Sequence, residues 1–280
     1  FLKNWLATNL SVRDIFTYQL LQVAAMHGHV NVCRFFKHWL QEEPVHPELE
    51  PGETKMEHRG AIRNAIECGH IDVCQFLEEW FGHDMGISPK DVECSLNNDP
   101  AEVLFVKAAA TKNGLAVCQW FKRWLKNTGD DLTEAEVGHA LKDAAANSNL
   151  ELCRWLFYDC GISLSKSYVL SALQCAAGHG TVDMCRLFQE WPKGENKGLT
   201  LDDLRSDDNL VLRTAVTHGN VKVCKFLRQW GLTLVDACSI NALTLAVDAE
   251  YMPVCRFLRA WSKTAIRGES CQMVRAENYS

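Results

Sequence analysis

A short segment that holds a cysteine and usually ends in tryptophan recurs seven times along the 280 residues. It reads VCRFFKHW at 32–39, VCQFLEEW at 73–80 and VCRFLRAW at 254–261, for example. Successive cysteines lie between 31 and 44 residues apart. A unit of that length cannot bury its apolar face alone, so it must stack on its neighbours. The chain is therefore predicted to be a repeat array, with repeats one to seven marked by Cys33, Cys74, Cys118, Cys153, Cys185, Cys224 and Cys255.

The same residue types stand at fixed distances from each cysteine. Nine residues before it (position −9) there is always alanine, and position −12 is always aliphatic. Positions +2 and +3 are large and apolar in most repeats. Spacings of three and four residues are typical of the buried stripes of helices. Each repeat is thus expected to hold a first helix carrying positions −12 and −9, and a second helix carrying the cysteine.

A glycine at position −5 separates the two helices in four repeats, at Gly28, Gly69, Gly180 and Gly219. Glycine is expected there because it ends a helix in the left-handed conformation at little cost. Lys-Asn-Gly at 112–114 and Asn-Ser-Asn at 147–149 replace the pattern in repeats three and four, and Asn tolerates that conformation. Ala-Glu-Tyr at 249–251 does not, so the seventh turn is expected to be the least regular.

The unit resembles the ankyrin repeat, whose core reads roughly L-x-x-A-A-x-x-G-H-x-x-V-V-x-x-L-L. The stretch 21–36 carries the likeness through Leu21, Ala24, Ala25, Gly28, His29, Val32, Cys33, Phe35 and Phe36. The likeness extends over all seven repeats, although the opening Thr-Pro is missing and Cys replaces the second Val. This Cys and Trp variant is similar to arrays in large DNA viruses and protists. The resemblance implies an all-α, ankyrin-like solenoid of helix-turn-helix units with few or no strands.

The links between repeats are expected to be partly helical. Thr200 with Asp203, Ser88 with Asp91 and Thr133 with Glu136 have the spacing of a capping box. A single array is assigned over 1–280. Residues 1–14 end a truncated repeat and 265–280 start a further link, so further repeats are expected on both sides. The seven repeats are assigned to 15–54, 55–98, 99–132, 133–164, 165–199, 200–234 and 235–264.

The longest polar insertion, Gln41–Thr54, holds five glutamates and three prolines. We expect a solvated loop there, since loops concentrate Pro and charge. The alternative is an acidic flap that meets a basic partner.

The composition argues against several classes of function. Acidic residues outnumber basic ones by 35 to 29, whereas nucleic-acid and anionic-membrane binders are more often basic. No apolar run is long enough to span a bilayer. The 13 cysteines are odd in number and include no CxxC pair, which favours reduced thiols over disulfides or zinc. We therefore expect no cofactor and no metal, and a location in the cytoplasm, that of a host cell if the chain is viral.

The sequence contains no motif of a known catalytic site. The pairs of Cys and His, such as Cys33 with His29, combine a buried anchor with a turn residue, so no enzyme is predicted. Cys68, next to a turn, is the better candidate for modification. The recurrent Trp at position +6 is expected to pack between repeats rather than to stack on bases or sugars.

Basic residues occupy position +1 in five repeats, at Arg34, Arg154, Arg186, Lys225 and Arg256. Glu151 and Asp183 lie three residues before Arg154 and Arg186, a spacing that favours local ion pairs on a solvated face. Phosphate or nucleic-acid contact along this stripe is the alternative.

The resemblance implies a non-enzymatic module that binds a protein partner on a concave face formed by the first helices and the links. The residues so implied vary between repeats while their neighbours stay constant. The chain is expected to be a monomeric array or part of a larger chain or complex, and a structural spacer or assembly subunit is the main rival. Three histidines at one equivalent position would make binding sensitive to pH. The partner-binding candidates are Met26, His27, Glu67, Cys68, Thr111, Lys112, Asn147, His179, Thr217, His218 and Asp248.

Overall fold

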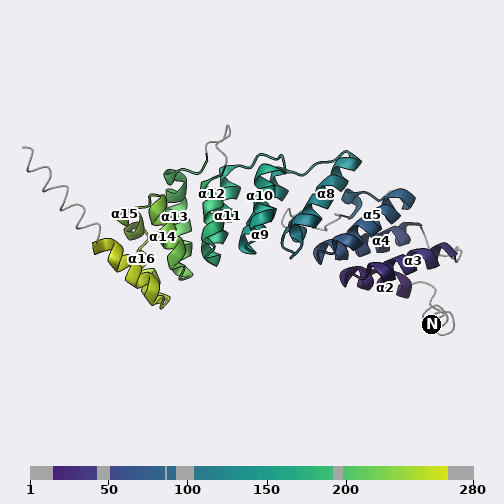
Figure 1. Ribbon diagram of the computed structural model, residues 1–280, viewed down its shortest axis with the longest axis horizontal. Coiled ribbons are helices and arrows are strands. Elements are labelled where there is room, and N and C mark those ends of the chain that lie inside the picture. Colours follow the sequence, from purple (N-terminus) through teal and green to yellow (C-terminus); the bar gives the residue numbers. More distant parts are fainter. Residues whose placement is uncertain (1–14, 43–50, 86, 93–103, 192–197, 264–280) are drawn as a thin grey trace, which may run out of the picture. The chain divides into compact units, whose positions relative to one another are not determined.

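The computed structural model describes residues 15–42, 51–85, 87–92, 104–191 and 198–263 (Figure 1). These residues form helices, turns and short links, and they contain no strand, so the all-α prediction is confirmed for them. The chain divides into two compact units, Phe1–Ala140 and Leu141–Ser280. The assignment of one array over 1–280 and its repeat boundaries stays a prediction. The expectations for 1–14 and 265–280 fall outside the described residues.

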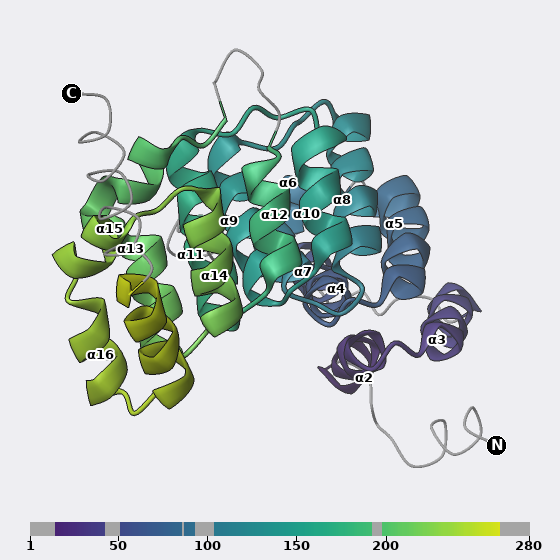
Figure 2. The same cartoon turned by 60° about the vertical axis from the view of Figure 1, so that its left-hand side comes forward.

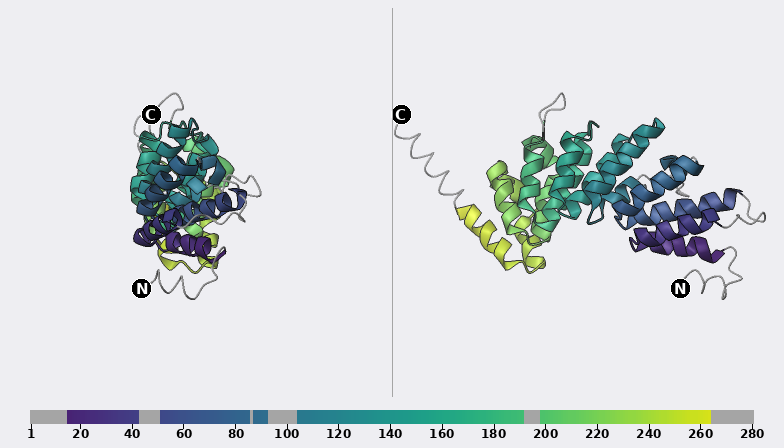
Figure 3. Two further views of the ribbon diagram at one scale, coloured as in Figure 1. Left: turned by 90° about the vertical axis from the view of Figure 1, so that its right-hand side faces the viewer. Right: turned by 45° about the vertical axis from the view of Figure 1, so that its right-hand side comes forward.

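The N-terminal unit consists of helix pairs in which first helices pack on first helices and second helices on second helices. Helix α2 lies beside α4 and α4 beside α7, while α5 contacts both α3 and α8 (Figures 1 and 3). The short α6 occupies a link. The elements are α2 (Ile15–Met26), α3 (Val30–Glu42), α4 (Pro51–Glu67), α5 (Ile71–Met85), α6 (Pro89–Val92), α7 (Leu104–Ala109), α8 (Gly114–Thr128) and the beginning of α9 (Glu134–Ala146).

The C-terminal unit repeats this arrangement. Second helices α10, α12 and α14 form one layer, and first helices α11, α13 and α16 form the other (Figure 2). A last helix covers 252–263. The other elements are α10 (Leu150–Tyr158), α11 (Lys166–His179), α12 (Val182–Gln189), α13 (Leu201–Thr217), α14 (Val221–Trp230), α15 (Leu234–Ser239) and α16 (Ala242–Asp248).

The constant positions of the repeat form the core. Every position −9 alanine and every anchor cysteine is buried. Burial raises the pKa of the Cys33 thiol to about 11 and that of the Cys153, Cys185 and Cys224 thiols to about 12. The predicted packing role of the position +6 tryptophans is confirmed for four of them, since Trp80, Trp124, Trp191 and Trp261 are buried. Trp230 is half-buried, and the side chain of Trp39 lies outside the described residues.

The acidic insertion Gln41–Thr54 was predicted to be a loop, but part of it is helical. Helix α3 continues through Glu42 and α4 begins at Pro51, so both ends of the Gln41–Thr54 segment are helical. Proline fits the first turn of a helix because its missing N–H is unpaired there in any case. Residues 43–50 lie outside the described part.

The turns correct a second prediction. The seventh turn is regular, with Glu250 at φ 59°, and Ser148 rather than an asparagine takes the same conformation in the fourth. The backbone explains this, because the Tyr251 amide donates to the Ala246 carbonyl at 2.9 Å, as the Asn220 amide does to Ala215 at 2.8 Å. These bonds and the packing offset the left-handed conformation, which costs a non-glycine residue about 1–2 kcal/mol.

The third turn is the irregular one. Asn113 has φ −99° rather than a left-handed conformation. Gly114 begins α8, and a Cβ there would lie 2.9 Å from the carbonyl oxygens of Ala108 and Ala109. Glycine is needed at this place because the chain passes close to the end of α7.

The links contain the predicted helical turns. The Asp203 carboxylate accepts hydrogen bonds from the backbone amide and hydroxyl of Thr200, and Glu136 does the same for Thr133. Helix α6 begins directly after Ser88. The sequence reasoning missed a further capping box, in which Asp236 accepts from Thr233 at 2.7 Å.

Whether the helix in a link is continuous with the first helix of the repeat follows the number of residues between the link's capping residue and the anchor cysteine. Thr133 and Ser165 each stand 20 residues before their anchor cysteine, and there α9 and α11 run through without a break. Thr200 stands 24 residues before Cys224, and α13 is interrupted over 206–209. Thr233 stands 22 residues before Cys255, and α15 and α16 are separate. The additional residues of the two longer links therefore lie at the break between the helices and not within the packed helices.

The repeats predict unequal costs for one substitution made at equivalent positions. Leu212 is fully buried where α13 packs on α16, whereas Leu243, at the same position of the last described repeat, is 41% exposed. We expect Leu212→Ala to lower the free energy of unfolding by about 2–5 kcal/mol, and Leu243→Ala by less than about 1 kcal/mol, because only the first leaves a cavity. Urea unfolding of both variants measures the difference, and equal losses would contradict the described packing.

The buried thiols predict a loss of stability at high pH. The pKa of Cys185 and Cys224 is raised from 9.0 to about 12 on folding, so their contribution is complete below pH 9 and is lost as the pH rises toward 12. Unfolding of the wild type and of Cys185→Ala should be measured at pH 8 and pH 10.5. We expect the stability gap between them to narrow at the higher pH, and an unchanged gap would show that the thiol does not titrate in this way.

Candidate binding surface

The structure places all eleven partner-binding candidates at the C-terminal ends of first helices or in the turns that follow. Six belong to the N-terminal unit and five to the C-terminal unit. Glu67, Thr111 and Thr217 are half-buried. The exposed candidates are Met26, His27, Cys68, Lys112, Asn147, His179, His218 and Asp248.

Hydrogen bonds between neighbouring repeats connect these helix ends in the N-terminal unit. His70, at position −4 of repeat two, has its Nε2 atom 3.0 Å from the carbonyl oxygen of Met26 in repeat one. Asn113 donates from Nδ2 to the carbonyl oxygen of Gly69 at 3.1 Å. Glu67 forms an ion pair with Lys107 of the next first helix at 3.0 Å. The candidate surface therefore continues from one repeat to the next within this unit.

The same connection recurs in the C-terminal unit. Asn220, at position −4 of repeat six, donates from Nδ2 to the carbonyl oxygens of Ala177 and Gly178 at 2.7 and 2.8 Å. These carbonyls end helix α11, where no intrahelical donor remains. The sequence analysis did not predict this contact between repeats. The recurrence of His or Asn at position −4 was the available signal.

The position −4 side chain also covers the glycine of the preceding turn. A Cβ added to Gly219 would lie 2.6 Å from the Tyr251 ring, and one added to Gly28 would lie 2.6 Å from the His70 ring. Both glycines have a positive φ of 72–73°. Glycine is thus required there by backbone conformation and also by the close approach of the next repeat.

The three histidines at position −6 differ in their contacts. His179 and His218 each bond through Nδ1 to a carbonyl oxygen one turn back in their own helix, Cys175 and Thr214, both at 2.9 Å. His27 stacks on His29, with ring centroids 6.1 Å apart. A carbonyl only accepts, so Nδ1 carries the proton in the neutral and the charged ring alike. pH-sensitive binding stays a prediction.

Cys68 is exposed, as the modification hypothesis requires. Among the described residues Cys238, in a link, is the other exposed thiol. The anchor cysteines are buried, which keeps them from reagents in solution.

A second row of contacts connects the links of the C-terminal unit. Lys166 reaches Asp203 of the next link at 2.7 Å, and Arg205 holds Asp236 with two bonds of 2.8 and 3.3 Å. Burial raises the pKa of the Asp236 carboxyl, but hydrogen bonds from Arg205 and Thr233 outweigh burial and hold it below its usual range. One carboxylate thus caps its own helix and binds the preceding link.

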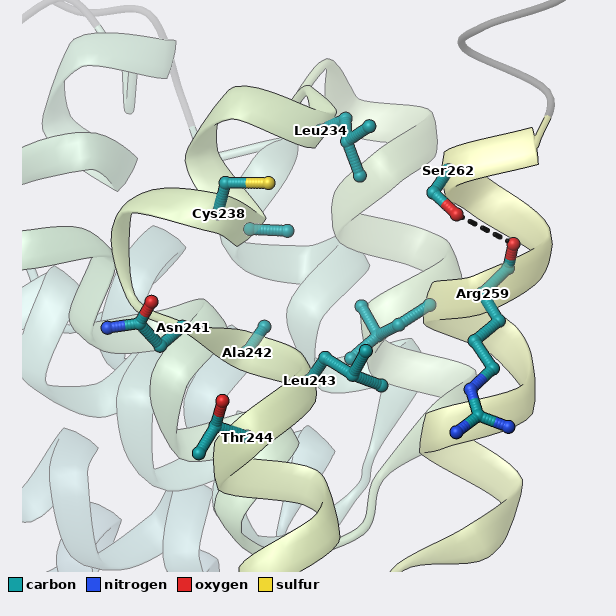
Figure 4. A pocket seen from close by; sticks show the side chains of 10 residues that line it. Leu234, Cys238, Asn241, Ala242, Leu243, Thr244, Arg259 and Ser262 are labelled. Atoms are coloured by element: carbon teal, nitrogen blue, oxygen red, sulfur yellow. Dashed lines mark hydrogen bonds between the residues drawn. The ribbon is translucent and has the colours of Figure 1, made fainter.

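The C-terminal unit contains a hollow of about 240 Å³ beside the last described repeat (Figure 4). Leu234, Ala242 and Leu243 line it, with Cys238 and Asn241 at its edge. A second, of about 420 Å³, lies between α11 and α13 and is lined by Ser171, Gln174 and Asp203 among others. Within the described ranges no group of three His, Cys, Asp or Glu side chains could hold a metal ion. None of the described helices is both long and apolar enough to cross a bilayer.

The contact between repeats predicts a stability effect at a polar surface residue. Asn220→Ala removes two hydrogen bonds to the end of α11, each with a net contribution of about 0.5–1.5 kcal/mol. We expect the free energy of unfolding to fall by about 1–3 kcal/mol. The matched control is Asn147→Ala, whose side chain bonds only to Asp143 of its own helix, and which should change stability by less than about 0.5 kcal/mol. Similar effects of both changes in thermal unfolding would refute the connection.

Comparison with known proteins gives one match. Residues 141–237 match the family model described as ankyrin repeats (3 copies). A search of curated proteins and a search of solved structures each found no match. The matched residues cover repeats five and six, with parts of their neighbours, and include the Asn220 contact and both link contacts. The helix pairs, left-handed turns and buried alanines of 141–237 agree with this match to ankyrin repeats.

Proposed function

We propose that the chain is a non-enzymatic protein-interaction module whose partner lies across the C-terminal ends of the first helices and the links that follow. Ankyrin repeats generally mediate protein–protein interaction and are typically non-enzymatic, which supports the general class. The face and the residues are our own assignment.

One contrast carries this proposal. The position −9 alanines are constant and buried, whereas the two residues at positions −7 and −6 differ from repeat to repeat. Most of these varying residues are exposed, for example Met26, His27 and His218. Recognition by a repeat protein uses such a varying surface on a fixed framework. The hydrogen bonds from position −4 connect the helix ends of repeats one and two, and those of repeats five and six, which supports one continuous surface across each of these pairs.

The state of the cysteines supports a location inside the cell. The eleven described cysteines are thiols rather than disulfide-bonded, and eight of them are buried. Free thiols persist in reducing compartments, whereas secreted chains rich in cysteine usually form disulfides.

Affinity capture from a lysate of the native cells tests the proposed face. The variant carries His27→Ala, Lys112→Ala, His179→Ala and His218→Ala. A control with Gln75→Ala, Gln119→Ala, Glu190→Ala and Gln229→Ala changes the same number of exposed residues, all on second helices or directly after one. We expect a protein partner, quantified by mass spectrometry, to be captured by the wild type and the control and to fall about tenfold or more with the variant, a loss of about 1.4 kcal/mol.

Circular dichroism must show equal folding of the three proteins. Equal capture by variant and control would place the binding site elsewhere and contradict the assigned face. Recovery of only further copies of the chain would favour the rival role as a spacer or assembly subunit.

A further inference from the structure

The last two second helices of the C-terminal unit have exposed surfaces that carry several cations and no anion. On α14 the exposed residues are three cations and Gln229. On the helix at 252–263 the exposed surface also carries three cations, together with Met252, Pro253 and Ala260. Neither helix contains an acidic residue. We call this surface the basic face, and its cations are Lys222, Lys225, Arg228, Arg256, Arg259 and Lys263.

The two helices are neighbours, so the six cations form one patch. The Arg228 guanidinium lies 5.5 Å from the centroid of the Trp261 ring, which connects α14 to the last helix. Figure 2 shows the two helices side by side. Val223 and Leu227 of α14 and Leu258 of the last helix are buried, which directs the cations away from the core.

The basic face differs from the second helices before it in the same unit. On α12 the predicted local ion pair is confirmed, since Arg186 contacts Asp183 at 3.1 Å. Helix α10 also carries both charges, but Glu151 and Arg154 form no ion pair although both are described, so that prediction was wrong. Exposed ion pairs gain little over solvation, so a favourable spacing alone does not ensure that one forms.

Among the described residues, five of the six cations of the basic face have no such ion pair. Within the described part of the chain, no carboxylate forms an ion pair with any of these five cations: Lys222, Lys225, Arg256, Arg259 and Lys263. The whole chain has a net charge of −6, so this concentration of positive charge is local. Such a patch raises the local concentration of anionic partners and speeds their association.

The dimensions of the basic face match the length of a short peptide segment. From Lys222 to Arg228 the helix rises about 9 Å, and from Arg256 to Lys263 about 10 Å. Packed helices lie about 8–10 Å apart. An extended segment rises about 3.3 Å per residue, so four to six residues would cross the face.

Nucleic acid fits the face less well. Single strands bind through exposed aromatic rings, but none of the aromatic side chains on these two helices is exposed. Phe226 and Trp261 are buried, and Trp230 and Phe257 are half-buried. A duplex reaching beyond the face would meet the acidic Asp183 and Glu190 on or beside α12.

We propose that the basic face binds a short acidic segment, rich in Asp and Glu, of a partner protein. The face lies on second helices, apart from the helix ends assigned above, so this proposal does not depend on that one. Carboxylates would supply the countercharge that the described part of the chain does not provide to the five cations.

Fluorescence anisotropy with a labelled hexaglutamate peptide tests this binding, and a hexaglutamine peptide serves as the neutral probe. The variant carries Lys225→Glu, Arg256→Glu and Arg259→Glu. The control carries Lys142→Glu, Arg154→Glu and Arg186→Glu, the same change of net charge on exposed residues of the same unit. We expect the variant to weaken binding of hexaglutamate about tenfold or more and the control less than threefold, with weaker binding as salt rises from about 50 to 200 mM.

A neutral variant, with Gln in place of Glu at the same three positions, keeps the long side chains and should bind between the wild type and the Glu variant. Circular dichroism checks the folding of each protein. Absence of hexaglutamate binding to the wild type, or equal loss in variant and control, would overturn the proposal. Tighter binding of a 20-base-pair duplex or of vesicles containing phosphatidylserine than of hexaglutamate would also overturn it, in favour of those ligands.

Discussion

One backbone hydrogen bond organises each regular repeat: the amide at position −4 donates to the carbonyl of the alanine at position −9, as Asn220 does to Ala215. This bond reverses the chain at the end of the first helix. It leaves most of positions −7 and −6 on the surface. In repeats two, six and seven it also places the position −4 side chain against the preceding turn. The same turn therefore pairs the two helices and also places the candidate residues at the surface.

The spacing of residues predicted those features that depend on apolar burial. Alanine and cysteine recur at helical intervals, so the two-helix repeat and its buried thiols could be deduced from the chain alone. The position of the candidate residues at the helix ends followed from the same register. What they bind does not follow from that register, because an exposed position is under no packing constraint.

Other features depend on neighbours that are distant in sequence. Asn220 stands 43 residues from Ala177, and nothing near either residue shows that they meet. Glu250 takes a left-handed conformation against its local preference, because the stacked repeat fixes the turn around it. The charge of α14 and the last helix was visible in sequence, but their union into one face required knowledge of which helices touch. Tertiary contact decided each of these cases.

The interruption of α13 over 206–209 has a consequence for how such arrays change length. Where a link helix and a first helix are continuous, one inserted residue would rotate the whole first helix by about 100° and turn its alanines away from the core. An interruption removes that mechanical coupling. It marks a point where insertions alter only the exposed link, which is consistent with repeat periods as unequal as 31 and 44 residues. A reporter or affinity tag placed there should leave the helical register intact.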